Sequence, residues 1–124
     1  MKVTCGTDII EIDRIKNSID KFGKTFINRI YTKNEIDYCE SKKNQKYQHY
    51  AVRFAAKEAI FKAISSELKE KYEVSWKDLE IVNDCNGRPI IKFNEDFFSN
   101  IESQDISLSH CKNYAVANVV IIWR

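Results

Sequence analysis

The sequence lacks long hydrophobic runs. No segment approaches eighteen uncharged apolar residues, which is close to the minimum that a membrane-spanning helix requires. The N-terminus also lacks a basic region followed by an apolar run and a small-residue cleavage site, the pattern of a secretory signal. We therefore expect a cytoplasmic protein that has no membrane as a partner.

Paired cysteines and several familiar catalytic motifs are absent too. The four cysteines, Cys5, Cys39, Cys85 and Cys111, are irregularly spaced, with no CxxC pair and no nearby pair of histidines. Structural zinc sites depend on such pairs, so free thiols are expected. The sequence contains no Walker loop, GxGxxG, HExxH or Ser-His-Asp order, so none of those sites is predicted.

The bulk composition is that of an ordinary soluble protein. A chain of 124 residues with 44% hydrophobic and 31% charged residues is long enough for one core, and no repeat or linker divides it. We expect a single domain over residues 1–124. The formal charge of +2 is too small to predict a nucleic-acid partner by itself, although basic residues gather in two groups. These are Arg14, Lys16, Lys21, Lys24 and Arg29, and then Lys42, Lys43 and Lys46.

The order of the predicted elements indicates an α+β fold. A strand is expected over residues 3–10, a helix from Ile12 to about Gly23, and a second helix that a capping box, Thr32 with Glu35, opens. A polar connection leads to the longest helix, over about 47–68. The chain then predicts a hairpin over 79–93 around Asn86-Gly87, a short helix at 96–101, and strands at 106–110 and 114–123. We expect one compact domain with a long central helix packed on an antiparallel sheet.

The stretch RFAAKEAIFKA, residues 53–63, has two contrasting faces. One face is apolar and needs no function: Val52, Ala56, Ala59, Ile60 and Ala63. The opposite stripe holds Phe54, Glu58, Phe61 and Lys62. Glu58 and Lys62 could be an ordinary i,i+4 ion pair on a solvated face. Alternatively both point into a partly desolvated cleft, where each charge would need a partner.

Two further cations, Arg53 and Lys57, lie on an adjoining side of the same helix. Three basic groups and one acid within about two and a half turns would make a seat for a phosphate, with the acid as a metal ligand. A solvated charged face explains them equally well.

Asp8 and His110 are isolated polar residues in predicted strands. Aspartate has poor strand propensity, and Asp8 either lies on the polar face of an edge strand or serves a site. His110 follows Ser107 and Ser109 at the end of a strand. A lone histidine is more often structural, but near phosphates it could donate a charge-assisted hydrogen bond.

Three stretches together are similar to one family. The segments GTDIIEIDRI (6–15), RFAAKEAIFKA (53–63) and SLSHCKNYAVANVVI (107–121) resemble the signature segments of holo-acyl-carrier-protein synthases, the small bacterial 4'-phosphopantetheinyl transferases. The NGRP turn at 86–89 resembles that family as well, so the similarity covers essentially the whole chain. It implies transfer of the phosphopantetheine arm of coenzyme A to a serine of apo acyl carrier protein in fatty acid biosynthesis. Adenosine 3',5'-bisphosphate is released.

The resemblance also assigns the catalytic residues. It implies that Asp8 and Glu58 are ligands of Mg²⁺, which takes oxygen ligands and commonly binds one or two carboxylates plus substrate phosphates. Lys62 would reach the coenzyme A pyrophosphate. The general base would be Glu58 or a metal-bound water, and the sequence does not choose between them.

Further positions match the family's coenzyme A and carrier-protein sites. Arg53, Lys57 and His110 are candidates for the coenzyme A phosphates, with Asn86, Gly87, Arg88 and Pro89 near the adenine; Cys111 departs from the expected threonine or serine. Carrier proteins are acidic around the modified serine, so Arg14, Lys21 and Lys24 would form the docking surface, with a solvated helix face as the alternative. The resemblance further implies a homotrimer with active sites between subunits.

Two other functions stay open. A non-catalytic module could use Arg53, Lys57 and Lys62 to hold a nucleotide or an RNA backbone, but it would have no use for Asp8. A transferase of the same chemistry could instead serve polyketide or peptide synthetase carriers, although the compact length favours the fatty-acid role.

Overall fold

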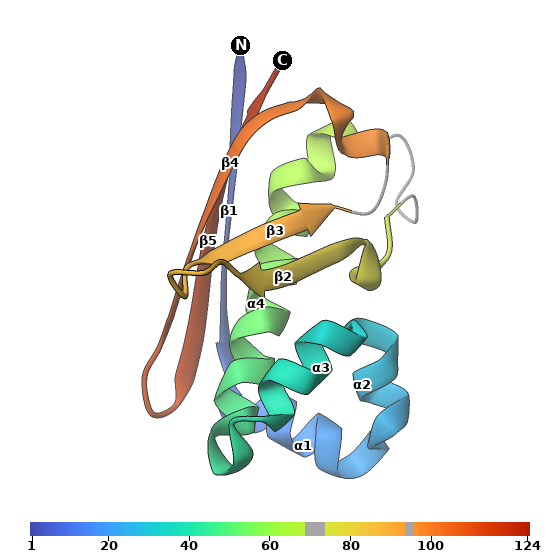
Figure 1. Cartoon of the computed structure of the whole chain (residues 1–124), viewed down its shortest axis with the longest axis vertical. Coiled ribbons are helices and arrows are strands. Elements are labelled where there is room, and N and C mark those ends of the chain that lie inside the picture. The colour runs from blue at the N-terminus through green and yellow to red at the C-terminus, as the bar shows by residue number, and fades with distance from the viewer. Residues whose placement is uncertain (69–73, 94–95) are drawn as a thin grey trace.

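The chain folds around one long helix, α4 (Lys46–Ile64), which packs along one face of a three-stranded sheet (Figure 1). The computed structural model describes residues 1–68, 74–93 and 96–124. The sheet contains β1 (Lys2–Glu11), β4 (Ile101–His110) and β5 (Tyr114–Trp123) in the order β1-β5-β4, and both pairings are antiparallel. The predicted α+β class, with a long helix on an antiparallel sheet, is confirmed.

Close packing of β1 against α4 depends on Gly6. A Cβ atom at this position would overlap the backbone carbonyl of Ala59 on α4. The five apolar residues predicted for the inner face of α4 are all buried, and three of them are alanines, which let the strand approach the helix closely. Gly6 therefore allows β1 to lie close to α4, two residues before Asp8.

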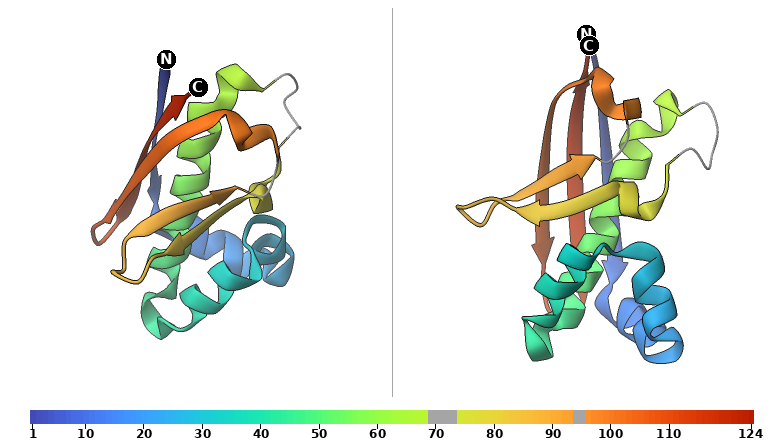
Figure 2. Two further views of the ribbon diagram at one scale, coloured as in Figure 1. Left: turned by 45° about the horizontal axis from the view of Figure 1, so that its top comes forward. Right: turned by 45° about the vertical axis from the view of Figure 1, so that its right-hand side comes forward.

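A two-stranded ribbon crosses α4 and reaches the β4 edge of the sheet (Figure 2). It consists of β2 (Leu79–Asn83) and β3 (Pro89–Phe93). The connection is a five-residue loop, in which the Asp84 carboxylate accepts hydrogen bonds from the backbone N–H groups of Asn86 and Arg88, each at 2.9 Å. Gly87 has a φ of 79°, which favours glycine. The predicted hairpin is confirmed, with a longer loop than a two-residue Asn-Gly turn.

Three short helices gather at one end of α4 (Figure 1). They are α1 (Ile12–Phe22), α2 (Lys24–Ile30) and α3 (Lys33–Glu40). The predicted capping box of α3 is present, because the Thr32 hydroxyl accepts from the Glu35 N–H and the Glu35 carboxylate accepts from the Thr32 N–H. The sequence did not predict α2, which begins directly after Gly23 ends α1.

Three predicted boundaries shift. The long helix ends at Ile64 and continues only as a 3₁₀ turn, Ser65–Glu67. The short helix predicted at 96–101 is a 3₁₀ turn, Asp96–Asn100, and β4 starts directly after it at Ile101, five residues before the predicted strand. Within the described residues, no helix is both long enough and apolar enough to cross a membrane.

Candidate active site

Asp8 and Glu58 line one cavity of about 330 Å³. Asp8 follows Gly6 by two residues, so it lies on the same face of β1, toward α4. Both residues are partly buried. Burial raises the pKa of Glu58, the negative charge of Asp8 raises it further, and the Lys62 ammonium opposes both effects. Two carboxylates that face one cavity and repel each other are suited to share a divalent cation.

Lys62 belongs to the same cluster. Its ammonium donates to the backbone carbonyl of Thr7 at 2.9 Å and to the Asp8 carboxylate at 3.3 Å. Lys62 therefore pairs with Asp8 on β1 instead of with Glu58 one turn earlier on its own helix. The interpretation of Glu58 and Lys62 as an ion pair with each other is therefore wrong. The cleft alternative describes Glu58, which lines the cavity, but not Lys62, whose side chain is 56% exposed.

A second cavity, of about 270 Å³, is basic. Arg53, His49, Arg88 and His110 line it, together with Tyr38, and no acidic residue is among its described lining residues. Arg53 is only 3% exposed, and its guanidinium carbon lies 4.2 Å from the centre of the Tyr38 ring. The Nε atom of Arg53 is buried without a hydrogen-bond partner. A buried cation whose donor is unsatisfied and which faces an open cavity is suited to bind an anion.

The two histidines lie in contact across this cavity. The ring centroids of His49 and His110 are 6.2 Å apart, and those of His49 and Tyr38 are 5.4 Å apart. Partial burial, together with the positive charges of Arg53 and Lys42 and the neighbouring His110, lowers the pKa of His49 to about 4. His49 is therefore neutral at pH 7.

Of the four residues predicted to lie near the adenine, residues 86–89, three line this cavity. Gly87, Arg88 and Pro89 line the cavity, and Asn83 at the end of β2 lines it as well. Asn86 is not among its lining residues; its backbone N–H is bonded to Asp84 within the loop. The Arg88 guanidinium pairs with Asp105 on β4 at 3.1 Å, and both side chains are exposed.

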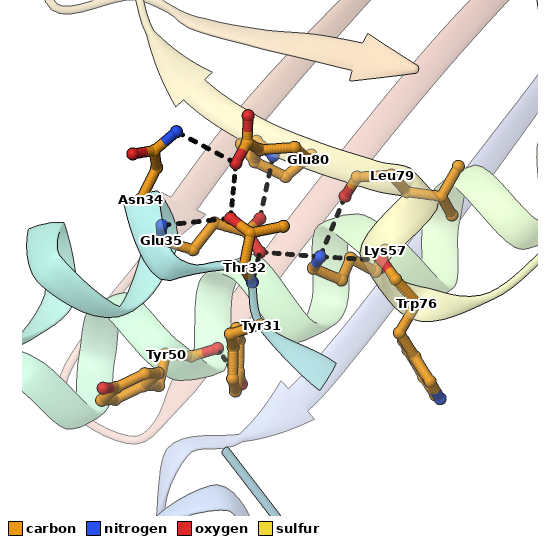
Figure 3. Close-up of polar contacts among 10 residues, drawn as sticks. Tyr31, Thr32, Asn34, Glu35, Tyr50, Lys57, Trp76, Leu79 and Glu80 are labelled. Atoms are coloured by element: carbon orange, nitrogen blue, oxygen red, sulfur yellow. Dashed lines mark hydrogen bonds and ion pairs between the residues drawn. The ribbon is translucent and has the colours of Figure 1, made fainter. Parts of the chain in front are cut away.

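Lys57 lines neither of the two cavities. Its side chain is fully buried, and its ammonium lies 2.8 Å from the Glu35 carboxylate (Figure 3). It also donates to the backbone carbonyls of Trp76 and Leu79, each at 2.9 Å. The interpretation of Lys57 as a phosphate ligand is corrected here, because all three of its N–H donors are used inside the fold; the solvated-face alternative is wrong for the same reason.

The three basic residues predicted to dock a carrier protein are exposed near the Asp8 cavity. Arg14 on α1 lines that cavity, Lys21 lies in the last turn of α1, and Lys24 begins α2. The Lys21 ammonium lies 5.2 Å from the ring centre of Phe22, which is itself 55% exposed. This surface combines positive charge with one large apolar side chain.

The sequence alone did not identify Tyr38 and His49 as residues of the basic cavity, nor Glu35 as the partner of Lys57. For His49 a signal existed, since it precedes Arg53 by four residues and therefore lies on the same side of a helix. Nothing comparable pointed to Tyr38 or to the burial of Glu35, because both depend on how α3 packs against α4.

Comparison with known proteins identifies the family. A family model described as the 4'-phosphopantetheinyl transferase superfamily matches residues 4–119. The chain belongs to this superfamily. Among the curated members, the holo-[acyl-carrier-protein] synthase of Ruminiclostridium cellulolyticum is 44% identical over 98% of this chain and 92% of its own. That of Protochlamydia amoebophila is 43% identical over 97% of this chain and 98% of its own.

Solved structures of superfamily members share the fold. The Helicobacter pylori holo-[acyl-carrier-protein] synthase in complex with coenzyme A superposes with a TM-score of 0.84 at 31% identity, covering 95% of this chain and 99% of the other. The Bacillus anthracis enzyme in complex with coenzyme A (3',5'-ADP) gives 0.77 at 38% identity over 95% and 94%. The resemblance drawn from the sequence segments is thereby confirmed.

Proposed function

We propose that this protein transfers 4'-phosphopantetheine from coenzyme A to a serine hydroxyl of apo acyl carrier protein, in cytoplasmic fatty acid biosynthesis. The observation that carries the proposal is Arg53, a buried guanidinium with an unsatisfied donor at the wall of a cavity whose described lining includes a second arginine and two histidines but no acidic residue. Such a site needs an anion, and coenzyme A supplies phosphates. Two similar proteins, from Helicobacter pylori and Bacillus anthracis, have been solved with coenzyme A.

Asp8 and Glu58 are the residues that would hold Mg²⁺. Their carboxylates face one cavity, and the influence of Asp8 on the pKa of Glu58 reflects their mutual repulsion, so a hard divalent cation fits the donor set. Mg²⁺ held by these two carboxylates would neutralise negative charge on the pyrophosphate and on the departing bisphosphate. Among the described residues no group of three or more metal-binding side chains occurs, which is consistent with a cation that completes its shell with substrate oxygens and water.

Other side chains would bind coenzyme A and accept the proton of the serine. Lys62, whose ammonium donates to the Thr7 carbonyl and the Asp8 carboxylate, would supply a positive charge to the pyrophosphate. Glu58 has a raised pKa, which makes it a better acceptor for the proton of the attacking serine than an ordinary carboxylate. Arg53 and His110 would hold the phosphate at the far end of coenzyme A, with Gly87, Arg88 and Pro89 beside the adenine.

Carrier-protein docking is assigned to Arg14, Lys21 and Lys24. All three are exposed, and Arg14 lines the Asp8 cavity, which suits an acidic partner whose serine must reach Glu58. Opposite charges on two exposed surfaces accelerate encounter more than they add affinity, and salt weakens them.

A homotrimer is part of the proposal, because no described element covers the outer face of the three-stranded sheet (Figure 1, Figure 2). Val3, Ile9 and Val120 on this face are 58%, 62% and 44% exposed, and apolar patches of this kind mark association surfaces. Ile9 also lines the Asp8 cavity, which supports active sites near subunit boundaries. Sedimentation equilibrium that finds only monomers would contradict this assembly.

Intact-mass spectrometry tests the function directly. Apo acyl carrier protein incubated with this protein, coenzyme A and Mg²⁺ should gain the mass of one phosphopantetheine arm, and the gain should disappear without the metal. Asp8→Ala and Glu58→Ala should each abolish the mass gain while leaving the circular dichroism spectrum unchanged. Full activity in both variants would contradict the metal assignment.

Stoichiometric coenzyme A binding without turnover on fatty-acid, polyketide or peptide synthetase carriers would favour the non-catalytic module. Faster modification of a polyketide or peptide synthetase carrier would instead favour that second role.

A further inference from the structure

His49 occupies a position in the basic cavity that the proposed function leaves without a role. Its ring lies between Tyr38 of α3 and His110 of β4, at centroid distances of 5.4 and 6.2 Å. It is one turn before Arg53 on α4, and all four residues line the same cavity. The His49 ring therefore packs against two rings in the same cavity that the Arg53 side chain lines.

The charged groups around His49 are almost all positive. Arg53 faces it from its own helix, Lys42 from the turn after α3, His110 from β4, and Arg88 from the β2–β3 loop. The nearby acids are engaged elsewhere: Glu40 pairs with Lys46 and accepts from the Tyr50 hydroxyl, and Asp105 pairs with Arg88. Partial burial and these positive groups therefore disfavour a proton on His49.

We propose that His49 takes up a proton when a phosphate monoester enters this cavity, and that this proton selects coenzyme A over its analogue without the 3'-phosphate. The inference rests on the proposed function, because coenzyme A must be the ligand. It assigns His49 as a specificity residue that switches from one ring N–H donor to two as the ligand binds.

The sign of the effect follows from charge. In the free protein the pKa of His49 is about 4, because burial and neighbouring cations disfavour the imidazolium. A phosphate monoester carries close to two negative charges near neutral pH, which favours the imidazolium and raises the pKa in the complex. Binding at a pH between about 4 and the raised pKa of the complex is then coupled to proton uptake, and affinity for the monoester rises as the pH falls through that range. A ligand without the monoester lacks this coupling.

Isothermal titration calorimetry measures that uptake. Coenzyme A and dephospho-coenzyme A are each titrated into the full chain with Mg²⁺, in two buffers of different ionisation enthalpy at the same near-neutral pH. The dependence of the observed heat on the buffer gives the number of protons bound. We expect greater uptake with coenzyme A than with dephospho-coenzyme A, and a matching rise in its affinity as the pH is lowered.

His49→Phe is the matched variant, because it keeps a ring between Tyr38 and His110 and removes only the titratable nitrogens. It should lose the excess uptake, and its preference for coenzyme A over the dephospho form should fall about tenfold, the loss of one charge-assisted hydrogen bond. In NMR spectra of the unmodified protein, the His49 ring signals, identified by their absence in His49→Phe, should move to imidazolium positions when coenzyme A is added.

The outcomes separate the inference from the function on which it rests. Equal proton uptake in the unmodified protein and in His49→Phe, with coenzyme A still bound, would overturn the role of His49 and leave the transferase standing. An unchanged preference for coenzyme A in His49→Phe would overturn it as well. Failure of the unmodified protein to bind coenzyme A would overturn the proposed function itself, and the inference with it.

Discussion

Arg53 and Lys57 lie one turn apart on α4 and are both almost completely buried, at 3% and 0% exposure, yet their surroundings differ. Lys57 has three acceptors, one of which is the Glu35 carboxylate (Figure 3). Arg53 has an aromatic ring against its guanidinium and a buried Nε without a hydrogen-bond partner. Burial alone therefore does not distinguish a structural cation from a binding one; what distinguishes them is whether the fold already satisfies the charge.

The comparison extends to what each cation holds in place. Glu35 accepts from Lys57, from the Thr32 N–H and from the Ile81 N–H, so this pair joins α3, α4 and β2. The loop after β2 carries Gly87 and Arg88 to the cavity in which Arg53 lies. The satisfied cation thus helps to position the wall of the site that the unsatisfied cation serves.

Breaking the buried pair should have the largest effect. Glu35→Gln and Lys57→Met should each lower the free energy of unfolding by about 3–5 kcal/mol, because each leaves an uncompensated buried charge. Urea denaturation followed by circular dichroism measures this. The double variant should cost less than the sum of the single ones, since the second change removes the charge that the first left unpaired.

The control is an exposed ion pair on α3, the helix that carries Glu35. Lys33 and Asp37 on α3 are 3.0 Å apart, but their side chains are 88% and 64% exposed, so Asp37→Asn should change the free energy of unfolding by at most about 0.5 kcal/mol. If Glu35→Gln costs no more than Asp37→Asn, the Glu35–Lys57 pair does not organise the fold as described here.

Replacing Arg53 should weaken coenzyme A binding without lowering the stability of the fold. Arg53→Gln should raise the KM for coenzyme A by about tenfold to a hundredfold, since charge-assisted hydrogen bonds to a phosphate are lost. Its stability should remain or rise, because an unpaired buried cation is removed. Steady-state kinetics and urea denaturation on the same preparation test both halves, and a loss of stability like that of Lys57→Met would mean that Arg53 is structural.

Arg53→Lys refines this result. Lysine keeps the positive charge but loses the planar group that packs on Tyr38 and that can bind a phosphate through two donors. We expect a KM between those of the unmodified protein and Arg53→Gln. Equality with the unmodified protein would mean that charge alone is sufficient in this cavity.

The same comparison shows what could be predicted from the sequence. The inner face of α4, the capping box at Thr32 and the hairpin at 79–93 were predictable because each depends on neighbours close in the chain. The family segments also identified Asp8 and Glu58, which line one cavity. The helix α2 was missed although Phe26 and Ile30 have helical spacing and are buried, because a seven-residue helix gives too short a pattern.

Lys57 could not be interpreted correctly because its partners are distant in the chain. Both alternatives placed it at the surface, whereas Glu35 lies 22 residues earlier and Leu79 lies 22 residues later. Only the packing of α3 and β2 over that side of α4 buries it. Tyr38 was missed for the same reason, since its role depends on the position of α3 beside Arg53.

Charge reversal at an exposed cation should have the smallest effect and completes the comparison. Arg14→Glu should raise the KM for acyl carrier protein several-fold with less change in the KM for coenzyme A, because an exposed charge contributes mainly to encounter. The effect should shrink as salt is added, since ions screen exposed charges over about 10 Å at 0.1 M.

Lys16→Glu is the matched control on α1. The Lys16 ammonium lies 5.6 Å from the ring centre of Tyr47, and Lys16 is outside the predicted docking set. Equal effects of Arg14→Glu on both substrates would argue against docking through this helix, and equal effects of Arg14→Glu and Lys16→Glu would reduce the surface to a general positive field.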